Sequence, residues 1–266
     1  MMYQMDRSPH TLKYETIRNC IFACDIEPSA VDIAQLRLWL ALVIDDEINP
    51  NAQTPLDGHR NPLPLPNLES NILCGNSLID EFEGIPLVKE SELLGNTGNY
   101  QRDITSDRFD SIISKLIETQ DELFHCDDTE KKKQLKEQIE SLRDMIILTQ
   151  LEGCDSAKIQ RYYDTKEMAS KPYILWQLDF ARVFKEKGGF DIVIGNPPYI
   201  GFHKVPDKEY NKKHFFTADG KYDFYVLFIE RAIQLTSATG FASYICPSYF
   251  YKRNYCCTKS DTATLQ

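Results

Sequence analysis

Four short hydrophobic runs lie along the chain between longer amphipathic segments. They are residues 19–24 (NCIFAC), 71–74 (NILC), 190–194 (FDIVI) and 241–246 (FASYIC). Runs of this length with little polar alternation are typical of parallel strands that are covered on both faces. Each run is followed by a polar or turn residue, so the pattern predicts four buried strands.

Helical patterns lie between these runs. One begins at Pro28, a residue type that is favoured in the first turn of a helix. It continues with apolar residues at helical spacing, namely Ile33, Leu36, Leu40 and Ile44. A second pattern covers residues 224–235. Strands that alternate with helices predict an α/β fold with a doubly wound, mostly parallel sheet.

Two segments interrupt the alternation. Residues 49–66 contain five prolines, which predicts a loop. Residues 103–150 are highly charged, with apolar residues at helical spacing in two halves. Asp127-Asp128-Thr129 separates the halves and can cap the second one, and Gly153 can end it. We expect an antiparallel helical hairpin inserted between two strands, with packing or spacing as its simplest role.

These patterns predict four regions. Residues 1–102 and 171–254 are expected to form two parts of one α/β domain, and residues 103–170 the inserted hairpin. Residues 255–266 are polar and patternless, which predicts a tail.

Composition excludes several classes of protein. Hydrophobic residues make up 42% of the 266 residues and charged residues 26%, so collagen-like, disordered and disulfide-scaffold proteins are excluded. No apolar run reaches the roughly 18 residues that a transmembrane helix needs, and the first residues lack the apolar core of a signal peptide. The eight cysteines form no C-x-x-C pair, so we expect a reduced, cytoplasmic protein without a metal site.

The charge is unevenly distributed. A net charge of −10 argues against a protein that coats nucleic acid by bulk charge. Residues 199–259 nevertheless contain nine basic and five acidic residues. Solvated loops explain this excess, and so does a local surface that faces phosphates.

The most informative residues are Asn196, Pro197, Pro198 and Tyr199, which directly follow the run 190–194. Two consecutive prolines remove two backbone donors and restrict φ twice, so the corner is stiff. Ligands of open α/β sheets bind beyond the carboxyl ends of strands, where this corner is expected. A proline-rich turn without a function is the alternative.

The corner offers acceptors to an amine. The Asn196 side chain and the Pro197 carbonyl suit the two N–H bonds of an exocyclic –NH₂ group, and Tyr199 offers a face on which a base can stack. An amine that is conjugated to an aromatic ring is a poor nucleophile. Accepting both of its hydrogens increases electron density on the nitrogen and favours its attack on an electrophilic methyl group.

The tetrad Asn196-Pro197-Pro198-Tyr199 resembles the catalytic motif of S-adenosylmethionine-dependent amino-methyltransferases that act on DNA adenine. Further segments match in the same order, namely residues 24–40, 73–79, 176–191, 221–230 and 240–247. The whole set resembles the adenine-N6 methyltransferase region of Type IIG restriction–modification or related phage-defence proteins. The resemblance implies the Rossmann-like methyltransferase fold, here incomplete and carrying the helical hairpin.

The resemblance also implies a set of cofactor-binding residues. Asp25 would accept hydrogen bonds from the ribose hydroxyls of S-adenosylmethionine, and Ile26 would lie against its adenine. Asn76 or Ser77 would bind the same adenine, and Tyr222 with Asp223 would lie near the cofactor and the target. The alternatives are a helix cap for Asp25 and a helix start for Tyr222 and Asp223.

The resemblance further implies how double-stranded DNA is bound. Asn196, Pro197 and Tyr199 would hold an adenine that is flipped out of the duplex, while Pro198 stiffens the corner. The basic segment 204–221 would contact phosphates through Lys204, Lys208, Lys212 and Lys213.

Two departures from the family pattern lead to further expectations. No glycine precedes Gly58, and residues 1–266 contain no match to the glycine loop that wraps the methionine part of the cofactor or to a target-recognition region. We therefore expect the protein to need further N- and C-terminal sequence, or a partner that supplies these parts. We expect residues 1–18 to be the helix after that loop. We also expect residues 1–266 alone to bind cofactor weakly or not at all and to associate or aggregate. Other functions stay open: methylation of cytosine N4, an RNA base or glutamine, or an inactive truncated remnant.

Overall fold

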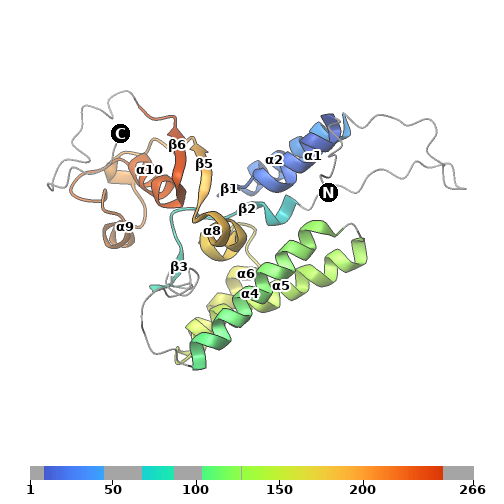
Figure 1. The fold of residues 1–266 in the computed structure, drawn as a ribbon. Coiled ribbons are helices and arrows are strands. Elements are labelled where there is room, and N and C mark those ends of the chain that lie inside the picture. Colours follow the sequence, from blue (N-terminus) through green and yellow to red (C-terminus); the bar gives the residue numbers. More distant parts are fainter. Residues whose placement is uncertain (1–8, 45–67, 87–103, 127, 248–266) are drawn as a thin grey trace, which may run out of the picture. The chain divides into compact units, whose positions relative to one another are not determined.

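A computed structural model describes residues 9–44, 68–86, 104–126 and 128–247 (Figure 1). The chain divides into two compact units, Met1–Ala181 and Arg182–Gln266. The predicted proline-rich loop 49–66 and the predicted tail 255–266 lie outside the described residues.

A βαβ unit forms the first part of Met1–Ala181. Helix α1 (Pro9–Cys20) leads to β1 (Ala23–Asp25), α2 (Pro28–Val43), the 3₁₀ turn η1 (Leu68–Ser70) and β2 (Ile72–Cys74). Strands β1 and β2 pair in parallel, with Asp25 opposite Cys74. The predicted strand over 19–24 was too long, because the helix over 9–20 continues to Cys20.

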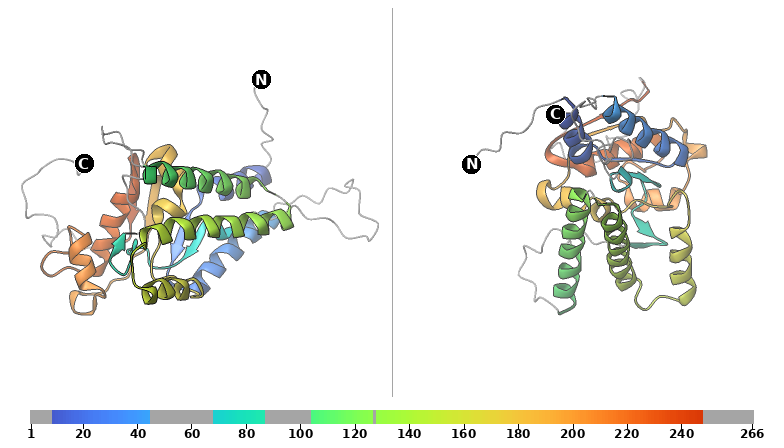
Figure 2. Two further views of the ribbon diagram at one scale, coloured as in Figure 1. Left: turned by 90° about the horizontal axis from the view of Figure 1, so that it is seen from below. Right: turned by 90° about the vertical axis from the view of Figure 1, so that its right-hand side faces the viewer.

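The hairpin helices are α4 (Ile104–His125) and α5 (Thr129–Gln150), which lie side by side in Figures 1 and 2. The Asp128 carboxylate accepts the Lys131 backbone N–H and caps α5, as predicted. Helix α6 (Ser156–Lys166) and the short strands β3 (Glu81–Phe82) and β4 (Ile85–Pro86) belong to the same unit. The hairpin shares one hydrophobic core with β3, α6 and residues 173–178, so it is packed rather than isolated.

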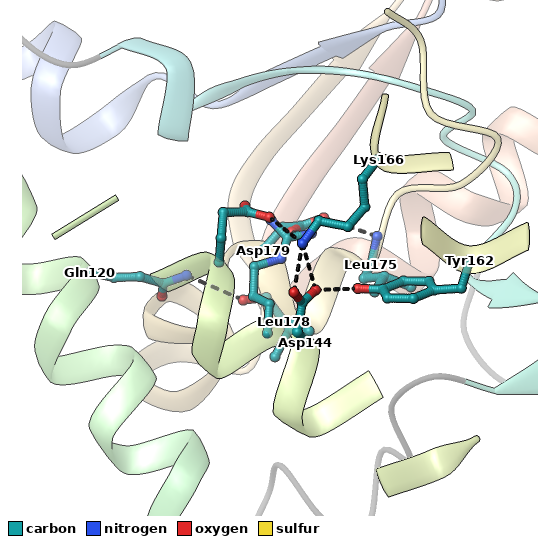
Figure 3. A network of polar contacts seen from close by, with 9 residues as sticks. Gln120, Asp144, Tyr162, Lys166, Leu175, Leu178 and Asp179 are labelled. Atoms are coloured by element: carbon teal, nitrogen blue, oxygen red, sulfur yellow. Dashed lines mark hydrogen bonds and ion pairs between the residues drawn. The ribbon is translucent and has the colours of Figure 1, made fainter. Parts of the chain in front are cut away.

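A polar network joins both hairpin helices to α7 (Trp176–Asp179), as Figure 3 shows. On α5, Arg143 Nη2 lies 2.6 Å from Asp179 Oδ1, and the two side chains are only 13% and 5% exposed. The other Asp179 oxygen accepts the Leu175 N–H at 3.0 Å. From α4, the Gln120 side-chain amide donates to the Leu178 carbonyl at 3.4 Å. The ion pair therefore neutralises a buried carboxylate where the hairpin meets α7.

The unit Arg182–Gln266 contains a second βαβ arrangement. Helix α8 (Ala181–Lys187) leads to β5 (Phe190–Gly195), followed by the 3₁₀ turn η2 (Phe202–Lys204), α9 (Lys208–His214), α10 (Phe224–Leu235) and β6 (Thr236–Tyr244). Strands β5 and β6 pair in parallel, with Gly195 opposite Tyr244. Gly189 precedes β5 with φ of 153°, and a Cβ atom there would lie 2.7 Å from the Leu235 carbonyl oxygen, so glycine is required.

The prediction of four buried strands was wrong for β5 and β6, and β1 is only partly buried. Ile192, Ile194 and Phe241 are 67%, 75% and 74% exposed. The physical reason is that each of these strands has one neighbour within the described residues, while α10 packs against the pair. The described strands form three two-stranded sheets, of which β1–β2 and β5–β6 are parallel as predicted and β3–β4 is antiparallel. A mixed α/β fold is thus confirmed, whereas one doubly wound sheet stays a prediction.

Among the helices that the structure describes, none combines the length and the apolar character that spanning a bilayer requires.

We expect the substitution Arg143→Met to lower the free energy of unfolding by about 3–5 kcal/mol, because it removes the ion-pair partner of the buried Asp179 carboxylate. Urea unfolding followed by circular dichroism measures this. A matched control is Lys131→Met, which removes the solvent-exposed pair with Glu122 and should cost far less stability, because solvent screens that pair. Equal stability of the two variants would contradict a structural role for the buried pair.

The same variant should depend on pH in a defined direction. Burial raises the pKa of the Asp179 carboxyl, and Arg143 opposes this rise. Without Arg143 the folded state keeps the proton at pH values where the unfolded chain, with an aspartate pKa of about 3.9, has lost it. Stability of Arg143→Met should therefore fall as the pH rises above about 4, and its deficit relative to the original chain should be larger at pH 8 than at pH 4.

Candidate functional site

The carboxyl ends of β1 and β2 bring four predicted cofactor-binding residues to one sheet edge. The Gly75 N–H donates to the Asp25 carbonyl at 2.9 Å, which continues the parallel ladder past Cys74. Asp25 ends β1 and Ile26 follows it, whereas Asn76 and Ser77 come two and three residues after the end of β2. Since parallel strands end at the same edge, these four residues lie together within Met1–Ala181.

Both strand ends have the same local turn. One oxygen of the Asp25 carboxylate accepts the Glu27 N–H at 2.9 Å, and the Asn76 side-chain oxygen accepts the Leu78 N–H at 3.1 Å. Such turns orient the short polar side chain just beyond the strand. Glu27 occupies the N-cap position of α2, so Asp25 is not the cap residue of this helix.

Accessibility differs between the two strand ends. Asp25 is exposed and Ile26 is 62% exposed, so both can reach a ligand. Asn76 and Ser77 are half-buried, and their backbones are fixed from the side: the Asn76 N–H donates to the Lys171 carbonyl, and the Trp176 indole N–H donates to the Ser77 carbonyl, each at 3.0 Å. A Cβ atom on Gly75 would lie 2.9 Å from the Tyr173 carbonyl oxygen, so only glycine fits this close approach.

Cys24 lies beside this edge without acting as a nucleophile. Burial raises the pKa of its thiol to about 12, so the group stays protonated and serves as a packing residue.

The tetrad Asn196–Tyr199 forms the corner at the carboxyl end of β5. Asn196, Pro198 and Tyr199 are exposed, while Pro197 is buried. The Tyr199 hydroxyl donates to the Ile245 carbonyl at 2.9 Å, and the Ile245 N–H donates to the Gly195 carbonyl at 3.2 Å. The corner is therefore tied to the segment that follows β6, and the Asn196 amide faces solvent rather than a packed interior.

Helix α10 supports the corner from its first turn. The Phe224 N–H donates to the Ile200 carbonyl at 2.8 Å, and the Tyr225 ring meets the Tyr199 ring edge to face at 6.2 Å. The sequence analysis did not identify Tyr225 as a contact of Tyr199. The position of Tyr225 in an apolar helical pattern indicates burial but not which side chain it packs against.

Tyr222 and Asp223 lie at the start of the same helix. Asp223 is at the N-cap position of α10 and is buried, in keeping with the alternative of a helix start. Tyr222 is fully buried, with its ring against Phe202 at 5.7 Å, and its hydroxyl lacks a hydrogen-bond partner within the part of the chain that the structure describes. Their role near a cofactor or target stays a prediction.

The four lysines predicted to contact DNA lie in the basic segment 204–221, which we call the basic lobe. Lys204 ends η2, and Lys208, Lys212 and Lys213 lie on α9. Lys204, Lys212 and Lys213 are exposed, whereas the Lys208 ammonium lies 4.5 Å above the Phe202 ring and donates to the His203 carbonyl. The sequence pattern did not predict this helix, because the seven residues of α9 are too few for a clear periodic pattern.

The described parts of the site offer acceptors and an aromatic face. The Asn196 side-chain oxygen and the Pro197 carbonyl can accept an amine, and Tyr199 can stack on a base. Within the described ranges, no three His, Cys, Asp or Glu side chains gather in a way that could hold a metal ion.

We expect Tyr199→Phe to loosen the corner while keeping the ring. Loss of the hydrogen bond to the Ile245 carbonyl should cost about 1 kcal/mol, which corresponds to roughly fivefold faster exchange of the Ile245 amide. Hydrogen exchange measured by NMR tests this. Tyr163→Phe, at another partly exposed tyrosine, serves as the control and should leave this amide unchanged. Unaltered protection in Tyr199→Phe would show that the hydroxyl does not hold the corner.

Comparison with known proteins identifies relatives over most of the chain. Residues 19–262 match the family model of the Eco57I restriction-modification methylase. The chain is 26% identical over 281 residues to a putative type II restriction enzyme and methyltransferase, RM.MjaORFECS2P, of Methanocaldococcus jannaschii, a match that covers 90% of the chain and 22% of that protein. The chain thus spans about a fifth of the length of this relative.

Shorter matches have higher identity. The chain is 36% identical over 86 residues to the Type II methyltransferase M.BstVI of Geobacillus stearothermophilus, covering 31% of the chain and 14% of that protein. It is 40% identical over 68 residues to the Type II restriction enzyme and methyltransferase RM.Eco57I of Escherichia coli, covering 24% of the chain and 7% of that protein. No solved structure matches the chain. Because the family model covers well over half of its residues, the chain belongs to the Eco57I restriction-modification methylase family.

Proposed function

We propose that this chain is the catalytic region of a site-specific DNA methyltransferase that transfers a methyl group from S-adenosylmethionine to N6 of adenine, in a restriction–modification or phage-defence system. Membership of a restriction-modification methylase family supports a DNA methyltransferase. The observation that carries the finer proposal is the exposed Asn196–Tyr199 corner at the carboxyl end of β5.

The corner acts on the amine through two acceptors. The Asn196 side-chain oxygen and the Pro197 carbonyl accept the two N–H bonds of the adenine amine, which concentrates electron density on N6. Pro197 and Pro198 restrict the backbone, so the carbonyl keeps its direction. Tyr199 stacks on the flipped base, and its hydroxyl bond to the Ile245 carbonyl limits the rotation of the ring.

The edge formed by β1 and β2 fits S-adenosylmethionine. When bound, this cofactor supplies an electrophilic methyl group on a sulfonium. The exposed Asp25 carboxylate can accept ribose hydroxyls, and the exposed Ile26 side chain offers an apolar surface to the adenine. Asn76 and Ser77, held by residues 171–176, are suited to the adenine edge.

Double-stranded DNA is the proposed partner. Lys204, Lys212 and Lys213 are exposed on the lobe after the corner and can contact phosphates. Lys208 would do so only after leaving the Phe202 ring. The cysteines in the described parts of the chain are free, which suits the proposed cytoplasmic location.

The decisive test is Asn196→Ala in the complete gene product. Loss of one acceptor of the reacting amine should lower methyl transfer to unmethylated plasmid DNA on the order of 100-fold or more, with cofactor affinity nearly unchanged. Transfer of labelled methyl groups and titration calorimetry measure the two quantities. Asp25→Ala is the paired variant, and there we expect weakened cofactor binding instead.

Mass spectrometry of the products identifies the accepting group. N6-methyladenine is the expected product. Detection of methylated cytosine, RNA or glutamine instead would show that the enzyme methylates another amino group than N6 of DNA adenine. N6-methyladenine formed at an undiminished rate by Asn196→Ala would refute the catalytic role of the corner.

A further inference from the structure

An aromatic side chain outside the tetrad is held in an exposed position. Phe215 and Phe216 follow α9 directly. Phe215 is buried, with the Arg231 guanidinium 5.0 Å from the centre of its ring, while Phe216 is 68% exposed. Adjacent aromatic residues are thus divided between the interior of the lobe and its surface. An isolated exposed phenylalanine is ordinary, so the inference depends on how its backbone is held.

A carboxylate on α10 fixes that backbone. One oxygen of Glu230 accepts the Phe216 N–H at 2.8 Å, and the other accepts the Thr217 N–H at 2.8 Å and the Thr217 hydroxyl at 2.6 Å. Hydrogen bonds to a charged acceptor are among the stronger ones in proteins. The backbone of Phe216 and Thr217 is therefore bound to α10, and both oxygens of the Glu230 carboxylate already accept hydrogen bonds.

The same helix supports the catalytic corner. Tyr225 of α10 contacts the Tyr199 ring, and the Phe224 N–H of α10 binds the Ile200 carbonyl. Through its Glu230 clamp, α10 also holds Phe216. All of these residues belong to the unit Arg182–Gln266. The position of Phe216 relative to the Asn196–Tyr199 corner is consequently set by one helix.

Local charge favours a nucleic acid as the partner of this surface. Residues 204–221 contain five lysines and three acidic residues in a chain with a net charge of −10. Lys212 and Lys213, within the last turn of α9, are exposed shortly before Phe216 in the sequence. An apolar ring on a lysine-bearing segment combines attraction to phosphates with a surface on which a base can stack.

We propose that Phe216 packs against the DNA bases next to the target adenine and stabilises the duplex in which that adenine is flipped out. The inference rests on the proposed methylation of flipped adenine and adds a residue to it. Flipping costs a few kcal/mol of pairing and stacking, and aromatic or apolar side chains that contact unstacked bases offset part of such costs.

The test uses the complete gene product. The methylated site is first identified on plasmid DNA, and the variants Phe216→Ala and Phe216→Trp are then compared on a DNA duplex that contains this site. We expect Phe216→Ala to lower kcat/KM roughly 10-fold, because base–aromatic stacking is lost, and Phe216→Trp to keep most of the activity. Ile233→Ala is the control, since it removes a comparably exposed apolar side chain from α10 itself. Cofactor affinity and the unfolding midpoint should not change in either Phe216 variant.

A second substrate separates base stacking from a structural role. When the target adenine is mismatched, flipping costs less, so the deficit of Phe216→Ala should shrink on that duplex. An equal deficit on paired and mismatched DNA, or none on either, would overturn the role of Phe216 while leaving methylation by the chain in place. If the original protein methylates no DNA, the proposed function fails, and the role of Phe216 fails with it.

Discussion

The parallel pairing of β5 with β6 is the constraint on which the candidate catalytic corner depends. Its register places Gly195 opposite Tyr244, so the chain leaves both strands at the same edge. The Tyr199 hydroxyl can then reach the Ile245 carbonyl, just beyond β6. A tetrad with two prolines is stiff on its own, but this pairing gives the stiff segment a fixed direction relative to a sheet.

Both units use the same principle at their sheet edges. In Met1–Ala181, Asp25 at the end of β1 and Asn76 after β2 each accept a backbone N–H two residues further on, and residues 171–176 hold the second strand end. The hairpin is connected to residues 171–176 through Asp179. This carboxylate pairs with Arg143 of the hairpin and also accepts the Leu175 N–H. The hairpin thus packs on the segment that supports a predicted cofactor edge, which agrees with the packing role expected for it.

Helix α10 has the corresponding function in Arg182–Gln266. Its first turn contacts the residues that follow the tetrad, and Glu230 captures two backbone donors of the basic lobe. A helix with most of its apolar residues buried is a rigid base for such contacts. The candidate catalytic corner and the basic segment proposed to contact DNA are thus both held by one helix.

The sequence by itself determined the order of the motifs, the extents of α10 and of the hairpin, the parallel pairing and the family, because these depend on local pattern and on residue identity. Only the tertiary structure decided that Lys208 lies over Phe202, that Tyr222 is buried and that Phe216 is exposed. It also decided that β5 and β6 are largely uncovered and that Arg143 meets Asp179. Each of these depends on which residues from distant parts of the chain come together, and hydrophobic periodicity carries no information on such partners.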